Sequence, residues 1–164
     1  MSAAYNLHRF LTAQAHTYNT VLAELQAGRK SSHWIWFIFP QIAGLGHSAM
    51  AQQFAITSLD EAKAYLQHLV LGPRLRECTQ LVLNVEGRSA EEIFGYPDYL
   101  KFRSCMTLFL TAATDNTTFK DALLKYFDGN PTNRRSTSWH GNRLRADRRT
   151  PGRVLTPFRE LLDF

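Results

Sequence analysis

The sequence predicts an all-α, single-domain protein, a compact multihelical bundle of about six to seven helices followed by an Arg-rich C-terminal tail. Apolar residues recur at three- and four-residue steps through residues 1–129, and helix start and stop signals bracket these runs. Lys and Arg balance Asp and Glu over the same residues, so the net charge of +5 lies wholly in residues 130–164. We therefore expect a helical domain over 1–129 and a basic tail over 130–164.

The first helix is expected over residues 6–27, where apolar side chains share one face and the glycine that follows acts as a left-handed cap. Residues 33–39 are apolar throughout and short enough to be a buried strand or a buried helix. A strand needs ladder partners, and the other strand-like run, residues 81–85, lies within a capped helical pattern. A helix that begins at Ser32 and ends before Pro40 therefore fits better.

Four more helices are predicted from their start signals. Two begin with a capping box, in which a Ser side chain and a Glu three residues later satisfy each other's free backbone donors. Two begin with a proline in the first turn. The start signals are at Ser58, Pro73, Ser89 and Pro97. A final helix is expected over residues 118–127.

The tail, residues 130–164, differs from the body in composition. It holds eight arginines and no lysine, against three acidic residues. Because apolar residues are sparse before Val154, residues 130–152 cannot offset the entropy of ordering, and we expect a loop or disordered linker there. A short terminal helix over residues 156–163, with Thr156 as its N-cap, is expected to dock on the body.

The arginines of the tail suggest contact with nucleic-acid phosphates, which arginine binds through paired hydrogen bonds. Nucleic-acid readers also interleave stacking aromatics with basic residues, and only Trp139 qualifies here. We therefore favour a solvated, mobile end over a nucleic-acid contact. A shifted reading frame is a third origin of the tail that the protein sequence leaves open.

Several classes of protein are disfavoured. No run approaches the roughly 18 apolar residues of a membrane span, and the N-terminus lacks a signal-peptide pattern, so we expect a cytoplasmic protein without membrane contact. Cys78 and Cys105 are too few for a disulfide framework and are expected to be reduced and buried. The six histidines lack metal-ligand spacing, and we expect no metal and no cofactor.

Residues 44–49 imitate the glycine pattern of a dinucleotide-binding loop. Pro40 and Gln41 separate the apolar run from these glycines, and Asp60 falls at a helix N-terminus rather than at the end of a second parallel strand. The segment also lacks the second glycine of a hydrolase nucleophile elbow. We therefore expect neither a Rossmann site nor a hydrolase triad.

More polar and aromatic side chains lie around these glycines than the packing of a helical corner requires. Backbone donors at the start of the next helix would receive an anion, Lys30 would supply charge, and a tryptophan would stack on a ring. A helix-loop-helix corner with core aromatics, and with Ser48 as a plain N-cap, explains the same residues, and the sequence does not decide between the two. The candidates are Lys30, His33, Trp34, Trp36, Gln41, Gly46 and Ser48.

A second polar stripe lies on one of the predicted helices. Asp98, Lys101 and Ser104 fall at three-residue steps and so share one side of that helix. Asp98 and Lys101 could equally form an exposed ion pair of little energetic weight. Arg74 is a further candidate anion ligand, with a surface salt bridge to Glu77 as the alternative.

The segment from Lys30 to Gln41, together with residues 44–48, resembles the hallmark of domain-of-unknown-function family 1810, a bacterial family sometimes given a calpastatin-like label. The resemblance spans about residues 7–129, and it includes Asp98, Lys101 and Ser104. It implies a compact, mainly helical cytoplasmic domain, and it supplies no reaction or substrate. Similar proteins usually end soon after a segment like residues 127–131, so the Arg-rich tail departs from the pattern.

Two functions remain open. The first is binding of a small anionic or nucleotide-like ligand in a pocket formed by both clusters, with or without turnover. In an enzymatic version His33 is the best proton carrier, and Asp98 or Lys101 tunes its charge. This function requires that Lys30 and Asp98 lie close together. The second is a protein- or nucleic-acid-interaction module that uses the Trp-rich corner or the Arg-rich tail. The sequence gives neither the ligand nor the oligomeric state.

Overall fold

A computed structural model describes residues 5–128 of the chain, and that part is helical, as predicted. Its helices are α1 (His8–Gln14), α2 (Tyr18–Gln26), α3 (Ile35–Ile38), α4 (Ala49–Gln53), α5 (Leu59–Gln67), α6 (Leu71–Leu83), α7 (Ala90–Phe94), α8 (Asp98–Ala112), α9 (Thr117–Leu123) and the π-helix η1 (Leu124–Asp128). The described residues contain no strand, only an isolated bridge between Ile42 and Ile56. The predicted basic tail and its terminal helix over 156–163 lie outside the described residues.

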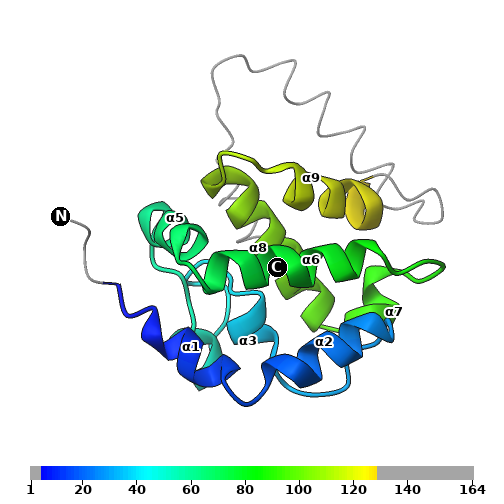
Figure 1. Cartoon of the computed structure of the whole chain (residues 1–164), viewed down its shortest axis with the longest axis horizontal. Coiled ribbons are helices and arrows are strands. Elements are labelled where there is room, and N and C mark those ends of the chain that lie inside the picture. Colours follow the sequence, from blue (N-terminus) through cyan, green and yellow to red (C-terminus); the bar gives the residue numbers. More distant parts are fainter. Residues whose placement is uncertain (1–4, 129–164) are drawn as a thin grey trace.

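Helix α8 is the centre of the bundle. It packs against α3, α5, α7 and α9, and seven of its residues are buried. Figure 1 shows α6 crossing the view in front of α8, with α9 above and α2 below. Helix α6 packs against α2, α5 and α9, so α6 and α8 together organise most of the other helices.

Aromatic rings fill the core between these helices. The ring of Phe102 on α8 stacks on Phe94 at a centroid distance of 4.6 Å and meets Phe39 edge to face at 4.9 Å. Phe10 of α1 meets Tyr65 of α5 edge to face at 5.0 Å. Each fully buried large apolar side chain stabilises the fold by roughly 1.5–3 kcal/mol relative to its exposed state, so this cluster links the N-terminal helices firmly to α8.

The prediction of one helix over residues 6–27 is wrong, because the chain bends after Gln14 and forms α1 and α2. Helix α1 packs against α3, whereas α2 packs against α6. The side chain of Gln14 is buried at the bend and donates from Nε2 to the carbonyl oxygen of Phe37 at 2.7 Å. The apolar positions that look like one face from sequence therefore serve two different packing directions.

Residues 33–39 contain a helix rather than a strand, as predicted, but α3 is a single turn. Ser89 and Glu92 form the predicted capping box. Ser58 caps α5 as expected, but the Glu61 carboxylate accepts from the backbone N–H and hydroxyl of Thr57, both at 2.8 Å, and so completes no reciprocal box with Ser58.

The last predicted helix, over residues 118–127, is two elements, α9 and η1. Lys125 of η1 donates to the carbonyl oxygens of Leu83 and Val85 at 2.6 and 2.7 Å, and the Tyr126 hydroxyl donates to that of Val82. These side chains satisfy free carbonyls at the C-terminus of α6. In the described part of the chain, no helix has both the length and the apolar character needed to cross a bilayer.

Candidate functional site

The segment between α2 and α3 carries the first candidate cluster, and a buried carboxylate fixes its path. Glu24 Oε1 accepts from the backbone N–H groups of Ser31 and Ser32 at 2.5 and 2.8 Å, and from Trp34 Nε1 at 3.1 Å. The backbone N–H of Lys30 donates to the carbonyl oxygen of Ile93 at 2.7 Å. The loop is therefore tied both to α2 and to α7.

Desolvation by burial raises the pKa of the Glu24 carboxyl, but hydrogen bonds from the Ser32 side chain, the Ser31 and Ser32 backbone and the Trp34 indole outweigh it. Together they lower the pKa to about 2. Glu24 is therefore ionised at neutral pH, and its role is to hold the loop. Sequence motifs did not single out Glu24, although an acidic side chain three positions after Val21 on an apolar helix face is a usable signal.

The loop and α8 meet at a three-residue ion cluster. Lys30 Nζ lies 2.6 Å from Asp98 Oδ2, and Lys101 Nζ lies 3.1 Å from Asp98 Oδ1. The side chains of Lys30, Asp98 and Lys101 are 5%, 19% and 21% exposed. We call these residues the lysine pair and its carboxylate. Lys30 of the first cluster thus lies next to Asp98 and Lys101 of the second, which is the closeness that the pocket hypothesis requires.

Two tryptophans flank the lysine pair. Lys30 Nζ lies 5.2 Å from the ring centroid of Trp34, and Lys101 Nζ lies 5.5 Å from that of Trp36, distances at which a cation is attracted by the ring. Trp34 is fully buried and belongs to the core, whereas Trp36 is partly exposed. The buried Nε1–H of Trp36 has no hydrogen-bond partner among the described residues.

The charges of this cluster do not cancel. Among the described residues, two ammonium groups face a single carboxylate, which leaves one excess positive charge in a mostly buried position. Burying such charges costs several kcal/mol per ion unless partners compensate them, and more than 90% of buried polar groups have a partner. The arrangement can therefore accept a further anion next to the lysines and the free indole N–H.

The other candidates from the first cluster lie in the loop before α4. Gln41 is buried, and Ser48 Oγ caps α4 by accepting from the backbone N–H of Ala51 at 3.1 Å. A Cβ on Gly46 would lie 2.4 Å from that of Ala51, so this glycine permits a close approach of loop and helix. His33 is exposed and, among the described residues, forms no hydrogen bond or ion pair with the lysine pair or its carboxylate.

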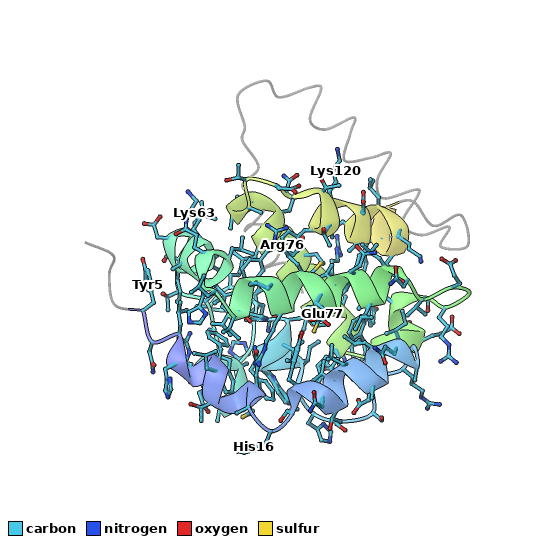
Figure 2. The ribbon with its side chains drawn as sticks, viewed as in Figure 1. Tyr5, His16, Lys63, Arg76, Glu77 and Lys120 are labelled. Atoms are coloured by element: carbon cyan, nitrogen blue, oxygen red, sulfur yellow. The ribbon has the colours of Figure 1, made fainter. Side chains whose placement is uncertain are left out.

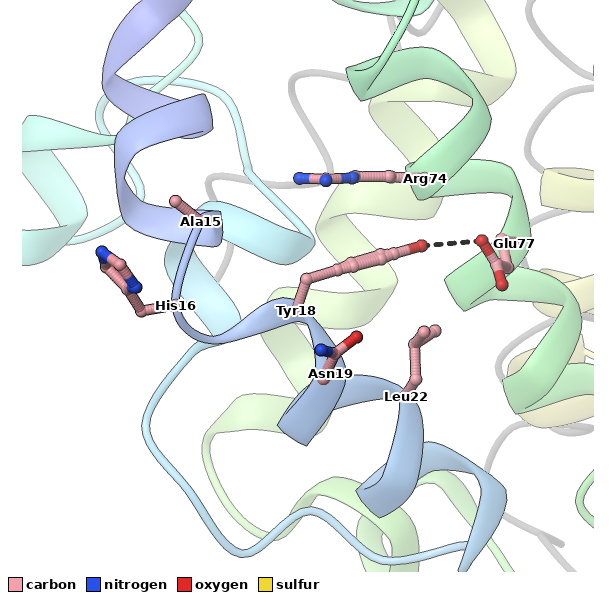
Figure 3. Close-up of a pocket in the computed structure, with 7 residues that line it drawn as sticks. All are labelled: Ala15, His16, Tyr18, Asn19, Leu22, Arg74 and Glu77. Atoms are coloured by element: carbon pink, nitrogen blue, oxygen red, sulfur yellow. Dashed lines mark hydrogen bonds between the residues drawn. The ribbon is translucent and has the colours of Figure 1, made fainter.

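Ser104 is buried on α8, and its hydroxyl donates to the carbonyl oxygen of Leu100 one turn earlier at 3.0 Å. Arg74 lies elsewhere, on α6, and its side chain faces the bend after α1. Its Nη1 donates to Gln14 Oε1 at 3.1 Å, and its guanidinium lies 4.4 Å from the ring centroid of Tyr18 (Figure 3). The salt bridge from Arg74 to Glu77 weighed in the sequence analysis is absent from the described ion pairs.

Within residues 5–128, no three His, Cys, Asp or Glu side chains are grouped in a way that could hold a metal ion. Both cysteines are free and buried there. The candidate ligand groups are thus the two lysine ammonium groups and the Trp36 indole N–H.

The comparisons with known proteins bear on the family of the chain and not on the candidate site. Residues 4–138 match the family model described as a protein of unknown function, DUF1810. The chain belongs to this family. The crystal structure of the conserved hypothetical protein Rv1873 from Mycobacterium tuberculosis is similar, with 53% sequence identity, a TM-score of 0.76, and coverage of 84% of this chain and 97% of that chain. No curated protein matches significantly.

Membership of the DUF1810 family confirms the resemblance seen in the segment from Lys30 to Gln41. It assigns no reaction, so the chemistry of the site has to be argued from its residues. The family match ends at residue 138, and most of the Arg-rich tail lies beyond it.

Proposed function

We propose that this protein binds a small anionic ligand at the lysine pair, with the Trp36 indole as an additional donor. The observation that carries the proposal is the excess positive charge of Lys30 and Lys101 over Asp98 at low exposure. A phosphate or carboxylate group next to these lysines would balance the charge and form charge-assisted hydrogen bonds, which are stronger than neutral ones.

The Trp36 indole restricts the chemical groups that a ligand can carry at this site. Among the described residues its buried Nε1–H has no hydrogen-bond partner, so an oxygen acceptor placed there would remove an unfavourable buried donor. The ring face of Trp36 is near Lys101, which leaves the N–H edge, rather than the face, for the ligand. An oxyanion such as a phosphate, free or as part of a nucleotide, provides several acceptors that could reach the indole and a lysine together.

The geometry supports a protein that binds the ligand without catalysing a reaction. His33, the proton carrier considered from the sequence, is exposed and in the described part of the chain makes no contact with Asp98 or Lys101. A general base must be within hydrogen-bond reach of the proton it moves, directly or through one water. At the Trp-rich corner Trp34 is fully buried and Trp36 is partly exposed, so the interaction-module alternative keeps Trp36 as its contact there.

A bacterial cytoplasmic location remains part of the proposal. Cys78 and Cys105 are buried free thiols, which suits a reducing compartment. The similar solved structure comes from a bacterium.

The test is calorimetric titration of inorganic pyrophosphate and ADP into the full chain and three variants. Lys101→Met removes one charge, and Trp36→Phe keeps an aromatic ring but removes the pyrrole part of the indole with its N–H. Lys63→Met is the matched control, because Lys63 is exposed on α5 and extends away from the body in Figure 2. Loss of one charge-assisted or indole hydrogen bond should weaken binding about tenfold, whereas the control should bind like the wild type.

Trp36→Phe gives a second, opposite signature. Without ligand this variant no longer buries an unpaired donor, which should offset the packing lost with the smaller ring, so its free energy of unfolding should stay close to that of the wild type. Equal binding by the wild type and Lys101→Met, or no binding of either probe by the folded wild type, would contradict the proposal.

A further inference from the structure

A polar groove lies where the bend between α1 and α2 faces α6. It is an open groove of about 560 Å³, lined by residues that include Tyr18, Asn19, Leu22, Arg74 and Glu77. Figure 3 shows these side chains coming from two directions, the first three from α2 and the last two from α6. None of them belongs to the lysine pair or its carboxylate.

A cation is held in place on one side of the groove. The Arg74 guanidinium stacks on the Tyr18 ring with 4.4 Å between its central carbon and the ring centroid. One of its five N–H donors is used in the hydrogen bond to Gln14, and the described residues show no other hydrogen bond from it. Gln14 is itself fixed by its hydrogen bond to the Phe37 carbonyl. The guanidinium is therefore positioned, and most of its donors are available to a ligand.

A carboxylate lies at the other end of the same ring. The Tyr18 hydroxyl donates to Glu77 Oε2 at 2.9 Å, and burial raises the pKa of this hydroxyl far above its ordinary value, so it remains a donor. Glu77 is exposed and takes part in no ion pair among the described residues. Figure 3 shows the Arg74 guanidinium extending along the ring away from Glu77.

The Tyr18 ring thus separates two opposite charges that face a common groove. On an isolated helix, side chains three residues apart can pair directly, as sequence spacing suggested for Arg74 and Glu77. Here the Arg74 guanidinium contacts the Tyr18 ring and Gln14, while the Glu77 carboxylate accepts a hydrogen bond from the Tyr18 hydroxyl. Each charged group keeps hydrogen-bonding positions for a ligand, and the Tyr18 ring sets the distance between the two groups.

We infer that this groove binds a small extended zwitterion, a molecule whose carboxylate and ammonium groups are joined by a short chain, such as an ω-amino acid. The carboxylate pairs with the Arg74 guanidinium, which matches carboxylate geometry through two parallel hydrogen bonds. The ammonium group pairs with Glu77. The intervening methylenes lie along the groove, where Leu22 supplies an apolar wall.

The ligand series that tests this inference varies one group at a time. 5-Aminopentanoate carries both charges at the ends of a chain, pentanoate lacks the ammonium group, pentylamine lacks the carboxylate, and glycine holds the same two charges too close together. Binding is followed by NMR titration of the isotope-labelled full chain, through the amide signals of Asn19 and Leu22. We expect 5-aminopentanoate to bind at least about tenfold more tightly than each of the other three.

Two variants locate the binding site. Glu77→Gln keeps an oxygen acceptor for the Tyr18 hydroxyl but loses the charge, and it should reduce 5-aminopentanoate binding about tenfold while leaving pentanoate binding unchanged. Arg74→Met should abolish binding of both carboxylates, and because it leaves buried Gln14 without its donor, Glu77→Gln provides the test that does not depend on its folding. The control is Glu91→Gln, an exposed carboxylate on α7.

Each result decides the inference. Tighter binding of 5-aminopentanoate that is lost in Glu77→Gln supports it. Equal binding of pentanoate and 5-aminopentanoate, equal binding by wild type and Glu77→Gln, or no binding of any probe by the folded wild type would overturn it. Lys101→Met, which tests the anion site, should leave this titration unchanged, so the two proposals fail or succeed separately.

Discussion

The Glu24 carboxylate connects the stability of the fold to pH in a way that can be calculated. Its pKa is lowered to about 2 in the folded protein, against an ordinary value of 4.5. A lowered folded-state pKa stabilises the protein above the unfolded-state pKa, and this contribution is lost as pH falls toward the folded-state pKa. The full effect at neutral pH is at most about 3 kcal/mol, falling to about 1 kcal/mol near pH 3.

Glu24→Gln is the perturbation that isolates this effect. Glutamine keeps nearly the same shape and one acceptor oxygen, but it holds the Ser31, Ser32 and Trp34 donors without charge assistance. We expect the variant to be less stable than the wild type by about 2–3 kcal/mol at pH 7, and the difference to shrink steadily as the pH is lowered from about 5 to 3.

Urea unfolding at a series of pH values, followed by circular dichroism, measures this difference directly. Glu91→Gln is the matched control, since Glu91 is exposed on α7, and it should change stability by no more than about 0.5 kcal/mol at any pH. A wild-type to Glu24→Gln difference that stays constant between pH 7 and 3 would refute the reasoning, because it would show that packing rather than charge holds the loop.

Three further predictions concern the framework. Arg9→Met breaks the 3.0 Å ion pair with the buried Glu61 carboxylate and should cost about 3 kcal/mol in urea unfolding, whereas a loss below about 1 kcal/mol would contradict the pairing. Gly72→Ala would place a Cβ 2.0 Å from a backbone carbonyl oxygen, so it should destabilise the fold by about 2–3 kcal/mol, and an unchanged melting temperature would show that α6 can shift. Burial raises the pKa of Cys78 to about 12 and that of Cys105 well above its usual range, so iodoacetamide should label neither thiol in the native protein and both in urea, and rapid native labelling would refute their burial.

Local signals predicted the helical fold well because they depend on nearby residues. Capping by Ser58 and Ser89, and the left-handed glycine after α2, act within one turn, and the structure confirms each of them. The break between α1 and α2 was missed because it depends on packing partners far along the chain. One continuous apolar face cannot reveal that its two halves contact α3 and α6 separately.

For the same reason, the candidate site could be predicted only in part from the sequence. The i, i+3 spacing of Asp98 and Lys101 predicted their contact, whereas the 2.6 Å contact of Lys30 with Asp98 joins residues that no local pattern relates. Trp34 and Trp36 looked equivalent in sequence, yet a one-turn helix sends the first into the core and leaves the second partly exposed. Arg74 lies away from the lysine pair, in a groove where its guanidinium contacts Gln14 and the Tyr18 ring.

The position of the lysine pair in the fold suits the proposed anion site. Lys30 is held between the Glu24 anchor and its backbone hydrogen bond to Ile93, and Lys101 lies on the central helix α8. A ligand that meets charges already fixed in place loses less of its binding energy to ordering the protein. The anchoring at Glu24 and the proposed anion site are therefore linked: weakening the anchor by Glu24→Gln should reduce anion affinity at neutral pH, although Glu24 itself is committed to the loop and not to the ligand.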